Sequence, residues 1–195
     1  MLEPETAAKL GGAIQPRASV RIALTAVFSA LIAVGTILGI PLPPPLYEIT
    51  WAPLIYLALG LLADRWTAFS ATALGSFLGE AYNITSRGGP PIFIPGIVWA
   101  RAPEVLIIAW ARKRGWKVVA AAMAVATLYE TVAFLIPDWL FYTYGLFGYG
   151  SPVDVATGFY TALPDVFTLI DLIYVPLALG IVRAAGPAFR RIGFA

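Results

Sequence analysis

The sequence predicts an all-α, polytopic membrane protein: a bundle of six transmembrane helices with both termini in the cytoplasm. Of its 195 residues, 59% are hydrophobic and only 12% are charged, whereas a soluble domain typically carries about 25% charged residues. The apolar residues fall into six segments, and the basic residues gather on one side of them. We therefore expect one membrane domain, residues 19–185, between a cytoplasmic N-terminal segment, 1–18, and a cytoplasmic tail, 186–195.

The six segments are separated by residues that stop a helix or mark a turn. The first, 19–40, ends at a proline-rich stretch that cannot continue a helix. Segments 51–63 and 66–82 meet at Asp64 and Arg65 and are short, since a span needs about 17 residues or more. The remaining three segments are 92–111, 117–136 and 160–183.

The basic residues support six spans rather than five. Cytoplasmic loops of membrane proteins are enriched in Lys and Arg. If 51–63 and 66–82 are separate spans, all 13 basic residues except Arg87 and Arg101 lie on the cytoplasmic side. With one span in their place, the basic cluster 112–117 would fall on the side opposite the N-terminus. The residues assigned to the cytoplasmic side are Lys9, Arg17, Arg21, Arg65, Arg112, Lys113, Arg114, Lys117, Arg183, Arg190 and Arg191.

Three connections are then expected on the outer face: 41–50, 83–91 and 137–159. The stretch 41–50 contains consecutive prolines, which favour a stiff polyproline II conformation, and it could be a lid or simply a rigid link. The stretch 137–159 is aromatic-rich and unusually long, and loops of such length are often functional.

The composition excludes several kinds of chemistry. The chain has no Cys and no His, so thiolate nucleophiles, imidazole bases and His-ligated metals are ruled out. It also has no phosphate-binding loop of the G-x-x-x-x-G-K-[ST] type. Its basic residues flank apolar spans, so they read as an orientation signal rather than a nucleic-acid surface. We expect no cofactor, no metal and no nucleic acid.

Ionisable residues inside the membrane point to a recess. Such groups are costly in lipid and usually face a cavity or a partner. At about 1.5 Å per residue, all but Glu104 fall in the outer half, which indicates a pocket that is open outside and closed below. The outer-half residues, with a formal charge of −3, are Glu80, Arg101, Glu130, Asp165 and Asp171.

Each of these residues also has a purely structural interpretation. Arg101 and Glu104 are three residues apart and could form a self-contained pair. Arg101 could instead contact the ligand or a pocket carboxylate, facing the recess with Glu104 as its partner on the floor side. Glu130 and Asp171 could line a cavity or bond between helices, and the same choice stands for Glu80 and Asp165.

Two aromatic residues lie deep enough to contribute to a site. Most of the outer aromatic residues fit an interfacial belt. Tyr129 beside Glu130, and Trp99 near Arg101, could instead stack on a flat cationic ring.

The first segment carries no charge within the membrane and presents small residues. Ala26 and Ala30 are four apart, with Ala23 and Ala33 at helical spacing on either side. Small residues at this spacing let another helix approach closely in lipid. The contact could be ordinary packing within the chain or docking of a partner.

The whole pattern resembles the substrate-binding S component of energy-coupling factor (ECF) vitamin transporters. Ala26 and Ala30 match the A-x-x-x-A motif of that family's first helix, and the segment 51–80 resembles its second and third helices. The resemblance, over roughly residues 19 to 185, implies an outward-facing pocket for a vitamin-like small molecule. It also implies a transmembrane coupling subunit, docked at Ala26 and Ala30, and two ATPase subunits.

The same resemblance suggests a substrate. Glu80, Tyr82 and Asn83 faintly resemble the members that bind thiamine precursors, and an acidic pocket favours a cationic heterocycle. Riboflavin, other vitamins and queuosine-type precursors are the alternatives.

The protein is expected to be a multi-pass protein of a prokaryotic cell membrane and not an enzyme. Two other functions are compatible with the sequence: an intramembrane enzyme using Glu130 with Asp165, and a small channel subunit. Asp165 and Asp171 are about 240° apart around an α-helix, so we expect them on different faces.

Overall fold

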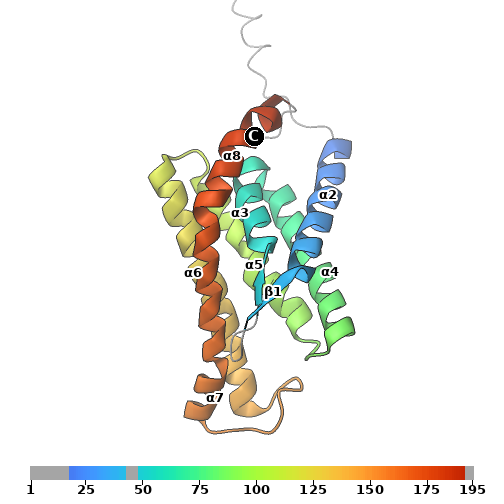
Figure 1. The fold of residues 1–195 in the computed structure, drawn as a ribbon, viewed down its shortest axis with the longest axis vertical. Helices are drawn as coiled ribbons and strands as arrows, with labels where there is room; N and C mark the ends of the chain where they lie inside the picture. Colours follow the sequence, from blue (N-terminus) through green and yellow to red (C-terminus); the bar gives the residue numbers. More distant parts are fainter. Residues whose placement is uncertain (1–17, 43–47, 192–195) are drawn as a thin grey trace, which may run out of the picture.

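The helices of the protein stand side by side along one long axis (Figure 1). The computed structural model describes residues 18–42 and 48–191, so most of the expected cytoplasmic ends lies outside the described residues. Apart from one small two-stranded sheet, the described elements are helical, which confirms the all-α class. In chain order they are α2 (Ala18–Ile37), β1 (Gly39–Pro41), β2 (Glu48–Thr50), α3 (Ala52–Leu62), α4 (Arg65–Arg87), α5 (Phe93–Ala111), α6 (Trp116–Tyr144), α7 (Val155–Ala162), η1 (Leu163–Ile173) and α8 (Tyr174–Arg191).

Four helical stretches are long and apolar enough to cross a membrane. They are α2, α5, α6 and the continuous stretch Val155–Phe189, which joins α7, η1 and most of α8. Large aliphatic side chains also cover the outside of the bundle, among them Ile22 in α2 and Val125 in α6. An exposed apolar surface of this extent is typical of contact with lipid rather than with water.

The helix α3 is short and forms the centre of the core. Pro53 lies in its first turn, where a missing amide hydrogen costs nothing. Tyr56, Leu57 and Leu59 are fully buried. An α-helix of 11 residues covers about 16 Å, which is roughly half the thickness of a bilayer core. The space beyond its N-terminal end is therefore left to other elements.

The helix α4 lies beside α2 and continues past the C-terminal end of α2 (Figure 1). Asp64 caps its first turn, accepting hydrogen bonds from the backbone amides of Trp66 and Thr67, each at 3.2 Å. Farther along, Gly75 and Gly79 lie against the backbone of α2. The predicted segment 66–82 was thus too short, because α4 continues to Arg87.

The predicted end of the first helix was also wrong. The helix α2 stops at Ile37, and the next residues form strand β1, which pairs antiparallel with β2 so that Ile40 faces Ile49. The prolines at positions 43–45, on which the lid-or-link alternative rested, lie outside the described residues.

The expected outer loop 137–159 is much shorter than predicted. Pro137 is accommodated inside α6, which continues to Tyr144 and ends at Gly145, where a φ of 63° favours glycine. The connection is therefore 145–154. Inside it, the Tyr149 hydroxyl donates a 2.8 Å hydrogen bond to the Asp138 carboxylate. Burial and that carboxylate raise the pKa of Tyr149, so the hydroxyl remains a donor at physiological pH.

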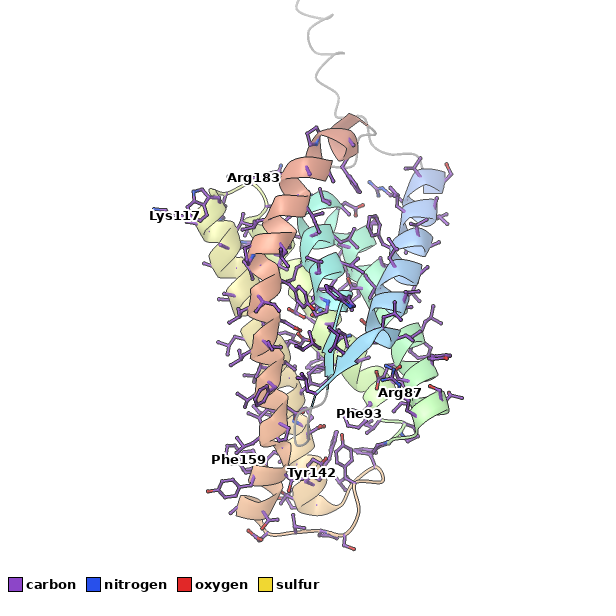
Figure 2. The ribbon with its side chains drawn as sticks, viewed as in Figure 1. Arg87, Phe93, Lys117, Tyr142, Phe159 and Arg183 are labelled. Atoms are coloured by element: carbon purple, nitrogen blue, oxygen red, sulfur yellow. The ribbon has the colours of Figure 1, made fainter. Side chains whose placement is uncertain are left out.

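The two ends of the bundle differ in charge. One end, called here the basic end, carries Lys117 and Arg183 (Figure 2). The α3–α4 turn with Arg65 and the α5–α6 turn with Lys113 lie at the same end, joined by the hydrogen bond from Arg112 to the Ala63 carbonyl. The opposite end, called the cavity end, carries the connections 88–92 and 145–154 and the side chains of Arg87, Phe93, Tyr142 and Phe159 (Figure 2).

Candidate functional site

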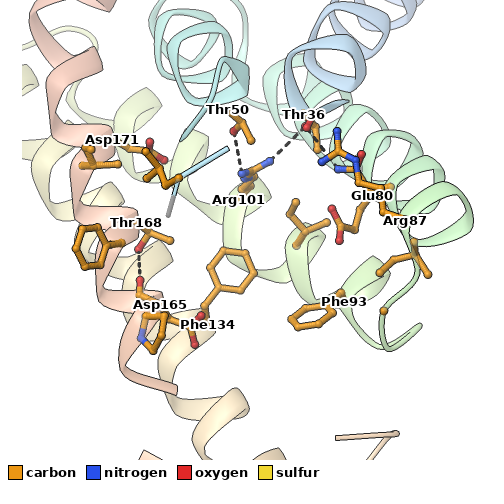
Figure 3. A pocket seen from close by; sticks show the side chains of 18 of the residues that line it. Thr36, Thr50, Glu80, Arg87, Phe93, Arg101, Phe134, Asp165, Thr168 and Asp171 are labelled. Atoms are coloured by element: carbon orange, nitrogen blue, oxygen red, sulfur yellow. Dashed lines mark hydrogen bonds between the residues drawn. The ribbon is translucent and has the colours of Figure 1, made fainter. Parts of the chain in front are cut away.

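A cavity of about 420 Å³ opens into the cavity-end half of the bundle. Its walls come from five helical elements and strand β2, while the fully packed core around Tyr56 and Leu57 fills the other half. Figure 3 shows the two facing walls, with η1 on the left and α4 with the start of α5 on the right. The residues that carry the argument are Thr36, Thr50, Glu80, Asn83, Arg87, Phe93, Arg101, Phe134, Asp165, Thr168 and Asp171.

Arg101 closes the inner end of this cavity. Its Nε donates to Oε1 of Glu130 at 2.9 Å, and its two terminal nitrogens donate to the hydroxyls of Thr36 at 3.2 Å and Thr50 at 3.4 Å. The Tyr56 hydroxyl donates to the other oxygen of Glu130 at 3.1 Å. Only 7% of Arg101 is exposed, and Glu130 is fully buried. A buried charge held by a partner and by hydrogen bonds is the arrangement that a low-dielectric site requires.

The predicted partnership of Arg101 with Glu104 is therefore wrong. Glu104 is fully buried, and neither of its carboxylate oxygens has a hydrogen-bond partner among the described residues. The reason is the packing of the helices: α6 brings Glu130 to the guanidinium, and Arg101 also reaches α2 and β2. The three-residue spacing of Arg101 and Glu104 within α5 therefore does not determine which carboxylate pairs with Arg101.

Asp165 and Asp171 share one wall, contrary to the prediction from α-helical geometry. They lie in η1, a 3-10 helix of 11 residues. A 3-10 helix has three residues per turn, so residues three apart are eclipsed. Asp165, Thr168 and Asp171 thus form a single stripe, and all three line the cavity (Figure 3).

Five of the eight predicted substrate-binding residues line the cavity. Glu130 lies directly behind the wall, bonded to Arg101. Trp99 is 63% exposed on the outside of α5, and Tyr129 donates from its hydroxyl to the Trp99 carbonyl at 3.0 Å. Neither of these two aromatic residues reaches the cavity. The five lining residues are Glu80, Asn83, Arg101, Asp165 and Asp171.

Most of the other lining residues were not predicted from the sequence, and three of them bear on the charge and hydrogen bonding around Arg101. Thr36 and Thr50 supply the hydroxyls that hold Arg101, and nothing in their sequence context distinguishes them from other threonines. Arg87 was assigned to the outer face but not to the pocket. It lines the cavity and donates to the Ile37 carbonyl at 3.1 Å. Counting Arg87 with the four carboxylates and Arg101 changes the formal charge of the site from −3 to −2.

The small residues of α2 lie on two faces. Ala26 and Ala30 are exposed, together with Val27 and Leu31. The opposite face, which includes Ile32, packs against α4. The Ala26–Ala30 face therefore has no neighbour within the described part of the chain.

Comparison with known proteins adds no identification: no family model, no curated protein and no solved structure matches the chain.

Proposed function

We propose that this protein is the substrate-binding subunit of an ECF-type importer, and that it captures a vitamin-like small molecule in the cavity. The observation that carries the proposal is the cavity of about 420 Å³, a mostly apolar space with a few polar groups that ends at the buried Arg101–Glu130 pair. Ligand sites for small molecules are typically concave, mostly apolar and equipped with a few convergent polar groups. A cavity closed by packed core on one side suits capture of a solute better than conduction through a pore.

The proposed arrangement in the membrane has six crossings with both ends in the cytoplasm. The four long apolar stretches supply four crossings, and α3 and α4 supply the other two. The basic end then faces the cytoplasm, as the enrichment of Lys and Arg in cytoplasmic loops requires, and the cavity end faces outward. The chain would be a multi-pass protein of a prokaryotic cell membrane.

The proposed partners are a transmembrane coupling subunit and two ATPases. The exposed Ala26–Ala30 face of α2 supports this part of the proposal, because small residues let a partner helix approach closely in lipid. The intramembrane enzyme receives less support. Glu130, one half of its supposed acid–base pair, is fully buried and bonded to Arg101 and Tyr56.

The excess of carboxyl over basic groups in the site favours a cationic heterocycle, such as thiamine or its pyrimidine precursor. A thermal-shift screen of the purified chain in detergent tests the proposal directly. Vitamins, purine derivatives and their precursors are added without ATP. We expect one chemical family to raise the melting temperature in a saturable way. If no compound does so, the proposed function is wrong.

A second experiment tests the coupling face. In a complex reconstituted with coupling and ATPase subunits, Ala26→Trp should leave ligand binding intact and abolish uptake. Val125→Trp is the matched control, because Val125 is 55% exposed on the outside of α6, away from the proposed contact. If uptake is unaffected by Ala26→Trp, the coupling subunit does not dock on this face of α2.

A further inference from the structure

The length of the 3-10 helix η1 is unusual. Runs of 3-10 helix longer than three or four residues are uncommon, because the hydrogen bonds are poorer and side chains three apart eclipse. Here the 3-10 conformation extends over 11 residues within a stretch that could cross the membrane. Its burial pattern has a period of three: Ala162, Asp165, Asp171 and Tyr174 are buried, and the partly buried Thr168 lies at the centre.

This conformation fixes both the direction and the separation of the two carboxylates. In an α-helix, Asp165 and Asp171 would point about 240° apart. In η1 they point to the same side. At a rise of about 2.0 Å per residue, their Cα atoms are about 12 Å apart along the wall. Figure 3 shows Asp171, Thr168 and Asp165 one below the other on this wall.

The stripe carries a carboxyl group at each of its two ends and none at its centre. The Thr168 hydroxyl is already engaged by the Thr131 hydroxyl at 2.6 Å and the Asp165 carbonyl at 2.8 Å. The phenyl ring of Phe134, on the neighbouring helix α6, also lines the cavity and lies between the two walls in Figure 3. A ligand lying along η1 would therefore meet an acid, an apolar middle and a second acid.

The other formal charges of the site occur as opposite pairs, whereas neither Asp165 nor Asp171 forms a salt bridge among the described residues. Arg101 neutralises Glu130 at 2.9 Å, and Glu80 and Arg87 on the facing wall contribute opposite formal charges. Asp165 is only 6% exposed, and its Oδ2 has no hydrogen-bond partner in the described part of the chain. Asp171 is 7% exposed and lies beside the Arg101–Glu130 pair, where its carboxyl interacts with that of Glu130 through a side-chain hydrogen bond. A protonated nitrogen of a ligand would supply the partner that Asp165 Oδ2 lacks.

We propose that the ligand of this cavity is an elongated organic dication, with one basic nitrogen held by Asp165 and a second held by Asp171. This inference rests on the proposed function and specifies its substrate class. Each carboxylate receives a charge-assisted hydrogen bond from a protonated nitrogen. The chain or ring system between the two nitrogens lies against Thr168 and Phe134.

Matched ligands test the proposal on the full-length protein in detergent. Isothermal titration calorimetry compares octane-1,8-diamine with 8-aminooctan-1-ol, which has the same chain length and one ammonium group fewer. A charge-assisted hydrogen bond contributes about 1.5 kcal/mol or more, so the diamine should bind at least about tenfold more tightly. Equal affinities would overturn the proposal.

Matched variants then locate the two charges. Asp165→Asn and Asp171→Asn should each abolish the advantage of the diamine over the amino alcohol. Asp154→Asn is the control, because Asp154 caps α7 in the exposed connection and Asn is an equally good capping residue. If the diamine keeps its advantage in both cavity variants, its two nitrogens lie elsewhere and the proposal fails.

The failure of this inference can be told apart from the failure of the proposed function. If a neutral or anionic compound binds tightly in the vitamin screen and diamines do not, the proposal of a dicationic ligand is wrong. The proposed function as a substrate-binding subunit is then unaffected. The absence of any ligand would overturn both. Unliganded melting temperatures of the variants show whether they are folded.

Discussion

Two glutamates of the same burial have opposite surroundings in this protein. Glu130 and Glu104 are both fully buried. Glu130 accepts from Arg101 and Tyr56, whereas Glu104 has no hydrogen-bond partner among the described residues. A buried ion pair that loses one member leaves an uncompensated charge. A buried polar group without partners has no hydrogen bond to offset its loss of hydration, so it does not stabilise the fold.

We therefore predict opposite effects of the same substitution at these two positions. Glu130→Leu should lower the free energy of unfolding by about 3–5 kcal/mol, because Arg101 is left buried without its partner. Glu104→Leu should leave the stability unchanged or raise it. Reversible unfolding in mixed detergent micelles measures both.

A double variant separates the lost pair from lost packing. Adding Arg101→Met to Glu130→Leu removes the stranded charge and should recover much of the stability, since well-packed apolar residues often replace a buried pair at no cost. If the double variant is as unstable as Glu130→Leu, the loss comes from the shape of the side chain. A loss in Glu104→Leu as large as that in Glu130→Leu would show that Glu104 has a partner.

The contact between α2 and α4 depends on glycines of α4. A Cβ on Gly75 would lie 2.7 Å from the Ile32 Cβ and 2.7 Å from the Ser29 carbonyl oxygen. Neither atom is the flexible end of a side chain, so the helices would have to separate. Gly79 is equally tight against Thr36, whose hydroxyl holds Arg101. The packing of these two helices is thus linked directly to the cavity.

We predict that Gly75→Ala lowers the free energy of unfolding by about 1–3 kcal/mol through overpacking. Gly180→Ala is the control, because a Cβ at that position in α8 meets nothing within 4 Å. There the ordinary preference of a helix for alanine should apply, a gain of about 0.5–1 kcal/mol. A Gly75→Ala protein as stable as the wild type would show that α2 and α4 are not in close contact.

The helices themselves could be predicted well, and their local geometry could not. Runs of apolar residues located the main helical segments, because burial in a core or in lipid demands them. The 3-10 conformation of η1 leaves no comparable signal: its apolar pattern suits either helix type, and tertiary packing selects between them. Assuming α-helical geometry therefore placed Asp165 and Asp171 on different faces.

For the candidate site, the charged residues could be predicted from the sequence, but their partners and the faces on which they lie could not. Charged residues inside apolar segments stand out, so Glu80, Arg101, Asp165 and Asp171 could be identified from their cost in lipid. Which carboxylate pairs with Arg101 depends on which helices meet in the fold. Because α6 packs against α5, Arg101 pairs with Glu130 and not with Glu104 of its own helix. Trp99 was assigned to the site from its depth, but depth does not say on which side of α5 a residue lies.

At the scale of the whole molecule, the short helix α3 makes room for the cavity. Its 11 residues fill only the half of the bundle nearer the basic end. Thr36 at the end of α2 and Thr50 at the end of β2 then line the space beyond it. A full-length helix in this position would occupy the site. The asymmetry of the bundle, with packed core at one end and cavity at the other, follows from this single element.

The crossing of α3 and α4 can be tested because the chain contains no cysteine. Single cysteines introduced at exposed positions report sidedness without background labelling. We predict that a membrane-impermeant maleimide labels Ser86→Cys and Ser151→Cys in intact cells. Arg65→Cys and Lys113→Cys should react only after the membrane is permeabilised, because both lie at the basic end.

Arg65 is the decisive position. If only the four long apolar stretches crossed the membrane, the chain from 38 to 92 would remain outside. Lys113→Cys would still be protected, but Arg65→Cys would react in intact cells. With six crossings, Asp64 and Arg65 form the turn that returns the chain from α3 into α4 on the cytoplasmic side. Labelling of Arg65→Cys from outside would therefore contradict six crossings. It would also contradict the proposed orientation of α4, whose cavity-lining end is expected to face outward.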